Sequence, residues 1–419
     1  MSRTVDYKNM KFEVNGGETV PGTPVLNRVR LSEGDSPDPA SVQKAPPWAA
    51  KGDKVCMISS SRNALEQRMF LKEATSLART GYCVSIVAPH PRDEVVSGIS
   101  IRAVPKFDSR LSRMIRTTWY VYREALRQKA QVYHFHNTEL MPVGWLLKLQ
   151  GKRVFYDVRE DTPADIRDRF YIPRYARPVV ANAVDIAEKF SGRFLDGIIA
   201  ATDHIGERFL TAKTAVVQNF PLLDEYSPES VPYLQREPMV LYIGTITPVR
   251  GLLELVDAMG LLPAELPARL SIGGAFDPPA LETEARQKAG WKRTDHAGWQ
   301  NRQGLLDLLG KARIGVVPFL PAANHTDCQP TKLFEYMVAG LPVVATDLLQ
   351  VGKIVRDAQC GILVEPGNPQ AMANAIQWLL EHPQEAEEMG LRGRQAILRT
   401  YNWNSQAHLL VQMYRRVTG

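Results

Sequence analysis

The sequence predicts an α/β protein made of two doubly wound parallel-sheet domains, each Rossmann-like, in tandem. Short apolar runs alternate with helix-length amphipathic segments, and this rhythm stops and restarts once, near residues 220–238. Parallel neighbouring strands need a crossover helix, so the rhythm implies parallel sheets. The length of 419 residues suits about two to three domains. We therefore expect a first domain at 51–220 and a second at 221–404.

Residues 1–50 differ from the rest of the chain. Prolines, glycines and charged residues alternate there without an apolar period. This composition predicts a disordered N-terminal arm. A tolerated extension and a partner-binding segment remain the two interpretations of its role.

The first domain is expected to begin with a buried strand and an amphipathic helix. Phe70, Ala74, Leu77 and Ala78 have helical spacing, and Gly81 ends the helix. Its strands are predicted at 54–59, 83–88, 132–136, 154–157, 197–201 and 215–217.

The second domain repeats this pattern after the linker. Its strands are predicted at 240–243, 270–273, 294–297, 314–317, 343–345 and 362–364. A last helical pattern covers about 405–417.

Composition and motifs exclude several classes of protein. The chain is 44% hydrophobic and 23% charged, which is typical of a globular protein, and its net charge of +6 is slight for its length. No signal peptide or membrane-length apolar run is visible, so we expect a cytoplasmic protein. Four scattered cysteines show no metal or disulfide spacing. The sequence also lacks GxxxxGK[ST], GxGxxG, GxSxG and Asp-x-Asp, which argues against kinases, dehydrogenases, serine hydrolases and a catalytic divalent metal.

The richest segment, 327–345, predicts a helix followed by a strand. Pro330, Thr331 and Lys332 stand at the expected helix start, where free backbone N–H groups and the dipole favour a phosphate. Glu335, one turn later, suits a ribose diol, and Asp327 in the preceding loop suits a more distant hydroxylated group. The alternative is an ordinary amphipathic helix with solvated charges.

The first turn of the second domain offers a second phosphate contact. Gly244 ends the strand at 240–243, and Arg250 and Gly251 open the next helix. A guanidinium can hold two phosphate oxygens at once, whereas a surface arginine in a loop is the alternative.

Two histidines lie at the end of the strand at 132–136. His134 and His136 are separated by one residue, so they share one face of the strand. Metal binding lacks a third ligand of suitable spacing. We interpret His136 as a cleft residue that exchanges a proton with a substrate hydroxyl, and His134 as a core histidine.

Together these segments resemble the family 4 retaining glycosyltransferases of the GT-B fold. Gly244 to Gly251 looks like the family's Gly-x(5)-[Lys/Arg]-Gly turn, and Pro330 to Ala345 is similar to its acidic nucleotide-binding helix. Further segments also resemble the family: 66–73, 134–136, Asn219 and 360–367. The resemblance runs from about Lys54 to the end of the sequence.

The resemblance implies transfer of a sugar from a nucleotide diphosphate sugar, UDP- or GDP-linked, to an acceptor hydroxyl with its configuration kept. Arg250 and Lys332 would neutralise the diphosphate in place of a metal. His136, Asp327 and Glu335 would form the catalytic set.

The resemblance also assigns two further regions. Trp299 and Gln300 would lie near the base. A C-terminal helix at about 405–419 would pack back on the first domain.

Two positions depart from the family's pattern. Asp327 stands where the family commonly has glutamate, and Thr245 stands where it often has arginine. Arg62 and Arg68 are candidates to supply that missing cation, and with Glu139 they are the acceptor-side candidates.

The segment from Arg110 to Arg127 is basic and contains Trp119, Tyr120 and Tyr122. On a helix, Leu111, Ile115, Thr118 and Tyr122 would share one stripe. One interpretation is a surface that rests on anionic lipid at the inner face of the plasma membrane and receives a lipid-linked acceptor. The other is a sheet-covering helix with a solvated basic face.

The expected role is thus sugar transfer in bacterial polysaccharide biosynthesis (exopolysaccharide or lipopolysaccharide) or in glycolipid biosynthesis. The alternatives are another GT-B enzyme, such as a sugar-nucleotide epimerase, and a non-catalytic nucleotide or sugar binder. Nucleic-acid binding is not expected, because the cations are dispersed and no recognition module is visible.

Overall fold

The structure, a computed structural model, describes residues 52–107, 109, 112–168, 172–226, 231–322 and 328–418. The predicted arm at 1–50 lies outside the described residues.

The first domain contains an eight-stranded sheet with the order β3-β4-β2-β1-β5-β6-β7-β8. All neighbours are parallel except β3 and β4, which are antiparallel. The strands are β1 (Lys54–Ile58), β2 (Cys83–Pro89), β3 (Glu94–Val96), β4 (Ile99–Val104), β5 (Val132–Phe135), β6 (Arg153–Val158), β7 (Gly197–Ala200) and β8 (Thr214–Val216).

Helices connect these strands, as parallel pairing requires. They are the π-helix η2 (Gln67–Ala74) with α1 (Thr75–Arg79), the π-helix η3 (Arg113–Thr117) with α3 (Thr118–Arg127), η4 (Thr138–Leu140) with α4 (Met141–Leu149), α5 (Thr162–Asp168), α6 (Arg177–Phe194), α7 (Asp203–Glu207) and η5 (Thr211–Lys213). The predicted pattern Phe70, Ala74, Leu77 and Ala78 is buried, although its first part is π-helical rather than α-helical.

The second domain contains a six-stranded, fully parallel sheet with the order β11-β10-β9-β12-β13-β14. The strands are β9 (Met239–Ile243), β10 (Arg269–Gly273), β11 (Thr294–His296), β12 (Ile314–Val317), β13 (Val343–Thr346) and β14 (Gly361–Val364). The strand order reverses between β9 and β12, and in sheets of this kind ligands bind at the carboxyl ends of those two strands.

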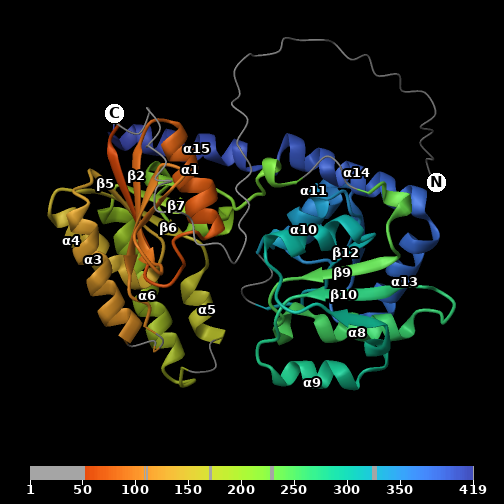
Figure 1. The fold of residues 1–419 in the computed structure, drawn as a ribbon. Helices are drawn as coiled ribbons and strands as arrows, with labels where there is room; N and C mark the ends of the chain where they lie inside the picture. The colour runs from red at the N-terminus through yellow and green to blue at the C-terminus, as the bar shows by residue number, and fades with distance from the viewer. Residues whose placement is uncertain are drawn as a thin grey trace, which may run out of the picture. The chain divides into compact units, whose positions relative to one another are not determined.

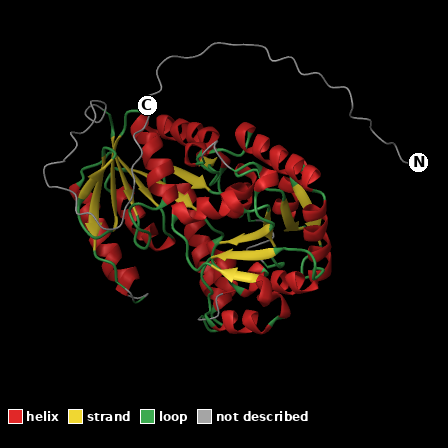
Figure 2. Ribbon diagram, turned by 45° about the vertical axis from the view of Figure 1, so that its right-hand side comes forward, coloured by secondary structure: helices red, strands yellow, loops and turns green. Residues whose placement is uncertain are grey.

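Helices lie on both sides of this sheet (Figures 1 and 2). They are α8 (Leu252–Leu261), α9 (Ala280–Gln287), α10 (Arg302–Lys311), α11 (Thr331–Val338), α12 (Leu349–Ala358), α13 (Pro369–Glu381) and α14 (Pro383–Arg399). Short 3-10 turns, η6 (Leu223–Glu225), η7 (Tyr233–Gln235), η8 (Pro248–Arg250) and η9 (Ala289–Arg293), lie in the connections.

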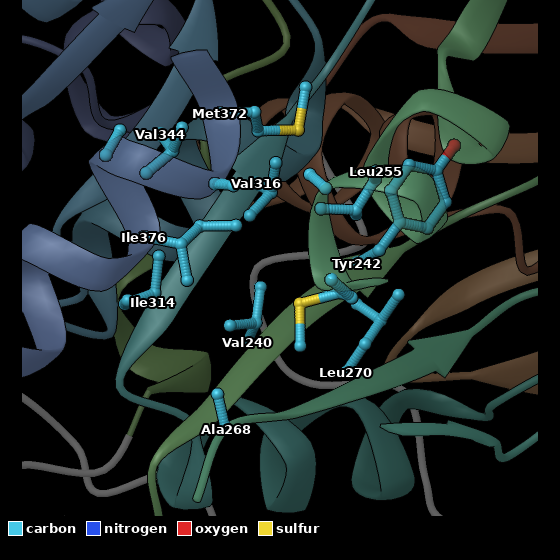
Figure 3. Close-up of a cluster of buried hydrophobic side chains, with 14 of the residues drawn as sticks. Val240, Tyr242, Leu255, Ala268, Leu270, Ile314, Val316, Val344, Met372 and Ile376 are labelled. Atoms are coloured by element: carbon cyan, nitrogen blue, oxygen red, sulfur yellow. The ribbon is translucent and has the colours of Figure 1, made fainter. Parts of the chain in front are cut away.

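One face of the second sheet packs against α8 and α13. Figure 3 shows Val240, Leu270 and Ile314 of the strands meeting Leu255 of α8 and Ile376 of α13, and all five are fully buried. Burying such side chains contributes roughly 1.5–3 kcal/mol each. This rigid layer fixes the strand ends from which the site is built.

The last helix, α15 (Trp403–Thr418), packs on the first domain rather than the second. Trp403, Leu410, Met413 and Tyr414 belong to the buried cluster that covers β1 and β2, and the Trp403 Nε1 donates to Ser76 Oγ at 2.9 Å. In Figure 1 α15 lies beside α1 and β2, although both are far from α15 in the sequence.

Two local patterns were not predicted. The hairpin β3–β4 turns through Ser97 and Gly98, both with positive φ, and its Ser-Gly signal between alternating apolar residues was missed. The burial pattern of η3 and α3 is the second: the buried positions are Thr117, Val121 and Ala125, while Ile115 of the stripe described above is 63% exposed. Leu111 lies outside the described residues. The π-helical turn η3 shifts the phase of the following helix.

Across the part of the chain that is described, none of the helices is both long and apolar enough to span a bilayer. Each of the four cysteines carries a free thiol.

Candidate functional site

The predicted phosphate-binding residues meet at the carboxyl end of β9. Gly244 has φ +105°, and a Cβ atom there would lie 3.8 Å from Lys332 Cε and 3.9 Å from Arg250 Nη1. Arg250 is held in place because its Nη1 donates to Thr245 O at 2.8 Å. Two cationic side chains from β9–α8 and from α11 therefore flank one glycine.

Lys332 is buried, and its Nζ has no hydrogen-bond partner among the described residues. Burial, and then the positive charge of Arg250, hold the pKa of Lys332 well below its usual range. The Tyr242 ring, whose centroid lies 3.5 Å from Nζ, offers some compensation through its negative face. An unpaired buried ammonium is costly, so this arrangement favours an anion.

Helix N-termini add to this anion site. Pro330 is the N-cap of α11 rather than a residue of its first turn, and neither it nor Gly251, the N-cap of α8, supplies a capping side chain. Thr331 is the exposed first residue of α11. The open N–H groups and the helix dipole favour negative charge. Asp327 lies outside the described residues.

Gly251 has a specific reason to be glycine. Its φ is +67°, and a Cβ atom would lie 1.7 Å from Pro318 O in the loop after β12. The chain thus approaches itself closely where the two central strands end.

Glu335 lies in the second turn of α11 and is paired with Arg302, the first residue of α10. Arg302 Nη1 donates to Glu335 Oε1 at 2.8 Å, and its Nη2 makes a short hydrogen bond to Glu225 Oε2. The guanidinium also lies over the Tyr226 ring, 5.0 Å from its centroid. Burial raises the pKa of Glu335, and Arg302 opposes that shift.

The predicted base-adjacent residues lie in the loop before α10. Trp299 is 73% exposed, whereas Gln300 folds back and donates to Ala297 O at 2.5 Å. Trp299 is therefore accessible for stacking, and Gln300 is already engaged with the backbone.

In the first domain His136 lies inside a buried ionic cluster. Its Nδ1 is 2.9 Å from Asp157 Oδ2 and 3.0 Å from Arg159 Nη2, while its Nε2 has no partner among the described residues. Burial lowers the pKa of His136 to about 4, which makes the ring neutral near pH 7. His134 is also fully buried, and its Nδ1 is 2.9 Å from Tyr414 Oη.

Two arginines and three carboxyls complete this cluster. Arg68 donates to both Asp157 oxygens, at 3.2 Å and 2.8 Å, and Arg159 pairs with Asp157 and Glu66. Burial, followed by the charge of Asp157, raises the pKa of Glu73 to about 8. The opposite holds for Asp157, because Arg68 and Arg159 outweigh its burial and keep its pKa well below its usual range.

Glu73, His134, His136 and Asp157 bring possible metal-ligand atoms within 4.8 Å of one another. However, guanidinium hydrogens from Arg68 and Arg159 already occupy the Asp157 oxygens that a cation would need. The donor set with two arginines fits a buried ion-pair network better than a metal centre.

The acceptor-side candidates lie in different surroundings. Arg68 is only 2% exposed and points into the ionic cluster. Arg62 is partly exposed, with its Nη2 3.9 Å from Glu160 Oε1. Glu139 accepts from Ser60 Oγ at 2.8 Å, where β1 and β5 end. Of the three, Arg62 and Glu139 are placed at the accessible end of the first sheet.

Several residues of the site were not found from the sequence. Arg302, Glu225 and Tyr226 surround Glu335, and Asp157, Arg159 and Glu66 surround His136. Asp157 and Arg159 had a readable signal, since charged residues at the carboxyl end of a buried strand are unusual. Glu225 and Arg302 had none, because each is a common residue type in a turn or at a helix start.

Two family models match the chain. Residues 67–217 match a glycosyl transferase 4-like domain, and residues 237–382 match a domain described as glycosyl transferases group 1. Together they cover most of both sheets and most residues of the candidate site, although Arg62, Glu66, Glu225 and Tyr226 lie outside the matched ranges.

Individual proteins agree with these matches. The phosphatidyl-myo-inositol mannosyltransferase of Mycobacterium leprae is 30% identical over 203 residues, which are 46% of this chain and 50% of that protein. The chain spans about half the length of the curated relatives first matched.

Solved structures show the same fold. Sucrose-phosphate synthase from Thermosynechococcus elongatus has a TM-score of 0.70 at 19% identity, covering 87% of this chain and 99% of that one. HepE of Anabaena, solved in complex with UDP-glucose, has a TM-score of 0.65 at 15% identity, covering 87% of this chain and 100% of that one.

Proposed function

Because the chain belongs to the family 4 glycosyltransferases of the GT-B fold, we propose that it transfers a sugar from a nucleotide diphosphate sugar to an acceptor hydroxyl, with the anomeric configuration retained. A lipid-linked or saccharide acceptor in bacterial polysaccharide or glycolipid biosynthesis fits the phosphatidyl-myo-inositol mannosyltransferase among its relatives. The UDP-glucose complex of HepE, which has the same fold, supports a UDP- or GDP-linked donor.

The observation that carries the proposal is the pair Lys332 and Arg250 beside Gly244. The Lys332 Nζ is buried without a hydrogen-bond partner among the described residues, at the point where the strand order reverses. A diphosphate there would receive two cations and the α11 N-terminus. These groups would stabilise the charge that develops on the leaving diphosphate, which is why we propose a metal-independent reaction.

The other roles follow from position. Glu335 would accept hydrogen bonds from the ribose hydroxyls, and exposed Trp299 would lie against the base. His136 would stand beside the reacting sugar, with Nε2 as its free ring nitrogen. Asp327 would bind donor-sugar hydroxyls.

Retention is proposed to follow front-face attack. The bond between the anomeric carbon and the phosphate oxygen breaks, the acceptor oxygen bonds to that carbon from the same side, and its proton passes to the departing phosphate oxygen. Trapping a covalent sugar adduct on a side chain would contradict this route.

An exposed apolar face of the first domain suits a membrane-bound acceptor. Met114, Ile115 and Trp119 are 54%, 63% and 57% exposed, next to Arg116 and Arg123. Leu149 of α4 and Ile186 of α6 are further exposed apolar residues of this domain, at 73% and 68%. Gln150, the residue after α4, donates to Tyr122 of α3, and Trp145 of α4 packs edge-on against Phe190 of α6. We propose that this face rests on anionic lipid.

A donor panel tests the proposed activity. UDP-, GDP- and ADP-sugars should be compared for stabilisation against thermal unfolding and for slow hydrolysis, since a bound donor stabilises the folded state by mass action. One nucleotide should raise the melting temperature, and Lys332→Met should abolish that shift while Lys353→Met, on the exposed face of α12, retains it. No response to any donor would overturn the proposal.

Turnover separates the enzyme from a binder or an epimerase. Arg250→Ala and Glu335→Ala should lose donor turnover and keep the wild-type circular dichroism spectrum. A folded wild-type protein that binds the donor without transferring its sugar, or that only epimerises it, would favour the alternatives.

A further inference from the structure

Arg302 joins two carboxylates that are distant in the sequence. Its Nη1 donates to Glu335 Oε1 at 2.8 Å, and its Nη2 donates to Glu225 Oε2. Glu335 belongs to α11, whereas Glu225 belongs to η6, in the segment that connects the two sheets. One guanidinium therefore ties the expected ribose carboxylate to the connecting segment.

Glu225 is in turn held from the first domain. Gln67 Nε2 of η2 donates to Glu225 Oε2 at 3.1 Å. Lys72, also in η2, donates to Asn219 Oδ1 at 2.7 Å, and its charge acts on both Glu225 and Glu335. Glu225 thus accepts hydrogen bonds from both domains.

The environment of Glu335 makes its charge depend on Arg302. Burial raises the pKa of Glu335, and Arg302 is the largest influence that lowers it again, followed by Lys72. Glu335 Oε1 is occupied by Arg302, and no hydrogen bond to Oε2 is found among the described residues. That second oxygen is available to accept from a hydroxyl.

We propose that Arg302 is a positioning residue of the donor site, which orients Glu335 for the ribose hydroxyls and anchors it through Glu225. This inference rests on the proposed function, because it takes a ribose as the group that Glu335 binds. The ribose does not need to displace Arg302, since it uses the other carboxylate oxygen. Glu225 holds the guanidinium in place whether or not the nucleotide is bound.

The test uses whichever nucleoside diphosphate, UDP or GDP, the wild type binds more tightly. It measures the dissociation constants of that ribonucleotide and of its 2′,3′-dideoxy analogue. Arg302→Met should weaken binding of the ribonucleotide by about tenfold or more, as expected for hydrogen bonds to a charged group. Binding of the dideoxy analogue should weaken little, because this nucleotide lacks the hydroxyls through which Arg302 acts. Arg302→Lys, which keeps the charge, should weaken ribonucleotide binding less than Arg302→Met does.

The pH profile separates positioning from mere structural support. In Arg302→Met the loss of affinity relative to wild type should shrink as the pH rises, because burial raises the pKa of Glu335 and a higher pH restores its charge. Arg286→Met, which breaks an exposed pair with Glu282 on α9, is the matched control and should match wild type. Circular dichroism and melting temperature report whether each variant folds.

The outcomes are distinct. Equal losses for the ribonucleotide and its dideoxy analogue, or a loss that does not change with pH, would overturn the role of Arg302 while leaving the proposed function intact. If Arg302→Met does not fold, Arg302→Lys gives the same comparison of the two nucleotides. A wild type that binds neither UDP nor GDP would overturn the proposed function, and this inference with it.

Discussion

Arg68 and Glu73, five residues apart in η2, approach each other with Nε and Oε1 2.9 Å apart inside the first domain. In an α-helix the neighbours on one face are three or four residues apart, whereas a π-helix bonds residue i to i+5 and brings such a pair nearly into line. The π-helix is therefore what places both side chains against β5 and β6. It builds the ionic cluster around His136.

Glu73→Gln should change how stability depends on pH. Because its pKa is raised to about 8, Glu73 keeps its proton in the folded state and releases it above about 4.5 when unfolded. The folded state then binds more protons, so this contribution to stability is lost as the pH rises from about 4.5 to about 8. Urea unfolding at intervals over this range should show Glu73→Gln gaining stability relative to wild type.

Exposed Glu385 in α14 supplies the control for this measurement. Glu385→Gln should follow the wild-type curve, since its side chain is in water. Lys72 and His136 also titrate differently in the fold, but they are present in every variant, so the difference isolates Glu73. A Glu73→Gln curve parallel to wild type would show that Glu73 is ionised.

Asp157→Asn should destabilise the first domain strongly. The carboxylate is fully buried and faces both Arg68 and Arg159, which would lose the one carboxylate that they share. Breaking a buried pair of this kind costs about 3–5 kcal/mol. Asp295→Asn, which breaks an exposed pair with Arg269, should change the free energy of unfolding far less. Similar effects of the two substitutions would contradict the buried network.

Donor binding should be linked to proton uptake at Lys332. Burial and the charge of Arg250 lower the pKa of Lys332, and a bound diphosphate would raise it again by favouring the ammonium form. Affinity should therefore fall as the pH rises. Calorimetry in buffers of different ionisation enthalpy should show that protons are taken up when the nucleotide binds, and Lys332→Met should remove this uptake. Equal binding heats in all buffers for the wild type would contradict proton uptake at Lys332.

Gly251→Ala, in the turn between β9 and α8, should lower the free energy of unfolding by more than the positive φ of this position alone would cause. The new Cβ would meet Pro318 O, so the loop after β12 must move. Gly340→Ala is the control, because Gly340 has a similar φ of +70° and nothing within 4 Å of its added Cβ. The control should cost about 1–2 kcal/mol in thermal unfolding. A larger loss for Gly251→Ala, together with weaker nucleotide binding, is expected.

The exposed face on α3 should bind vesicles that contain anionic lipid. The double variant Ile115→Ser/Trp119→Ser should fail to float with such vesicles, while Leu391→Ser/Leu398→Ser, exposed leucines of α14, should float as wild type does. Less protein should float with neutral vesicles, because these lack the negative lipid charge that attracts the arginines. Wild type that floats with neither kind of vesicle would remove the membrane proposal.

The predicted fold follows from periodicity, and this part of the sequence analysis is confirmed. Runs such as Val240 to Ile243 and Ile314 to Val317 are continuous apolar stretches, which parallel strands buried on both faces require. The family, too, could be identified from the sequence, because Gly244 and Glu335 lie in motifs of fixed spacing. Hairpin β3–β4 was missed because its strands are short and partly exposed.

The surroundings of the site could not be predicted in the same way. The partners of Glu335 and His136 come from other elements: Arg302 is 33 residues from Glu335, and Asp157 is 21 residues from His136. Such pairs are decided by strand order and helix placement, not by local pattern. Burial likewise made Arg68 a structural group in the cluster, although its sequence position suggested contact with substrate.

The position of α15 has a consequence for how the chain folds as it is synthesised. Trp403, Leu410 and Tyr414 complete the core of the first domain, yet the ribosome makes them only after the whole second sheet. Domains generally fold as units in the order of their synthesis. Here the N-terminal unit must wait with an open apolar surface while the C-terminal one matures. The second domain is thus expected to fold first. Until α15 has been made, the apolar surface of the first domain stays exposed, and a chaperone would be most needed then.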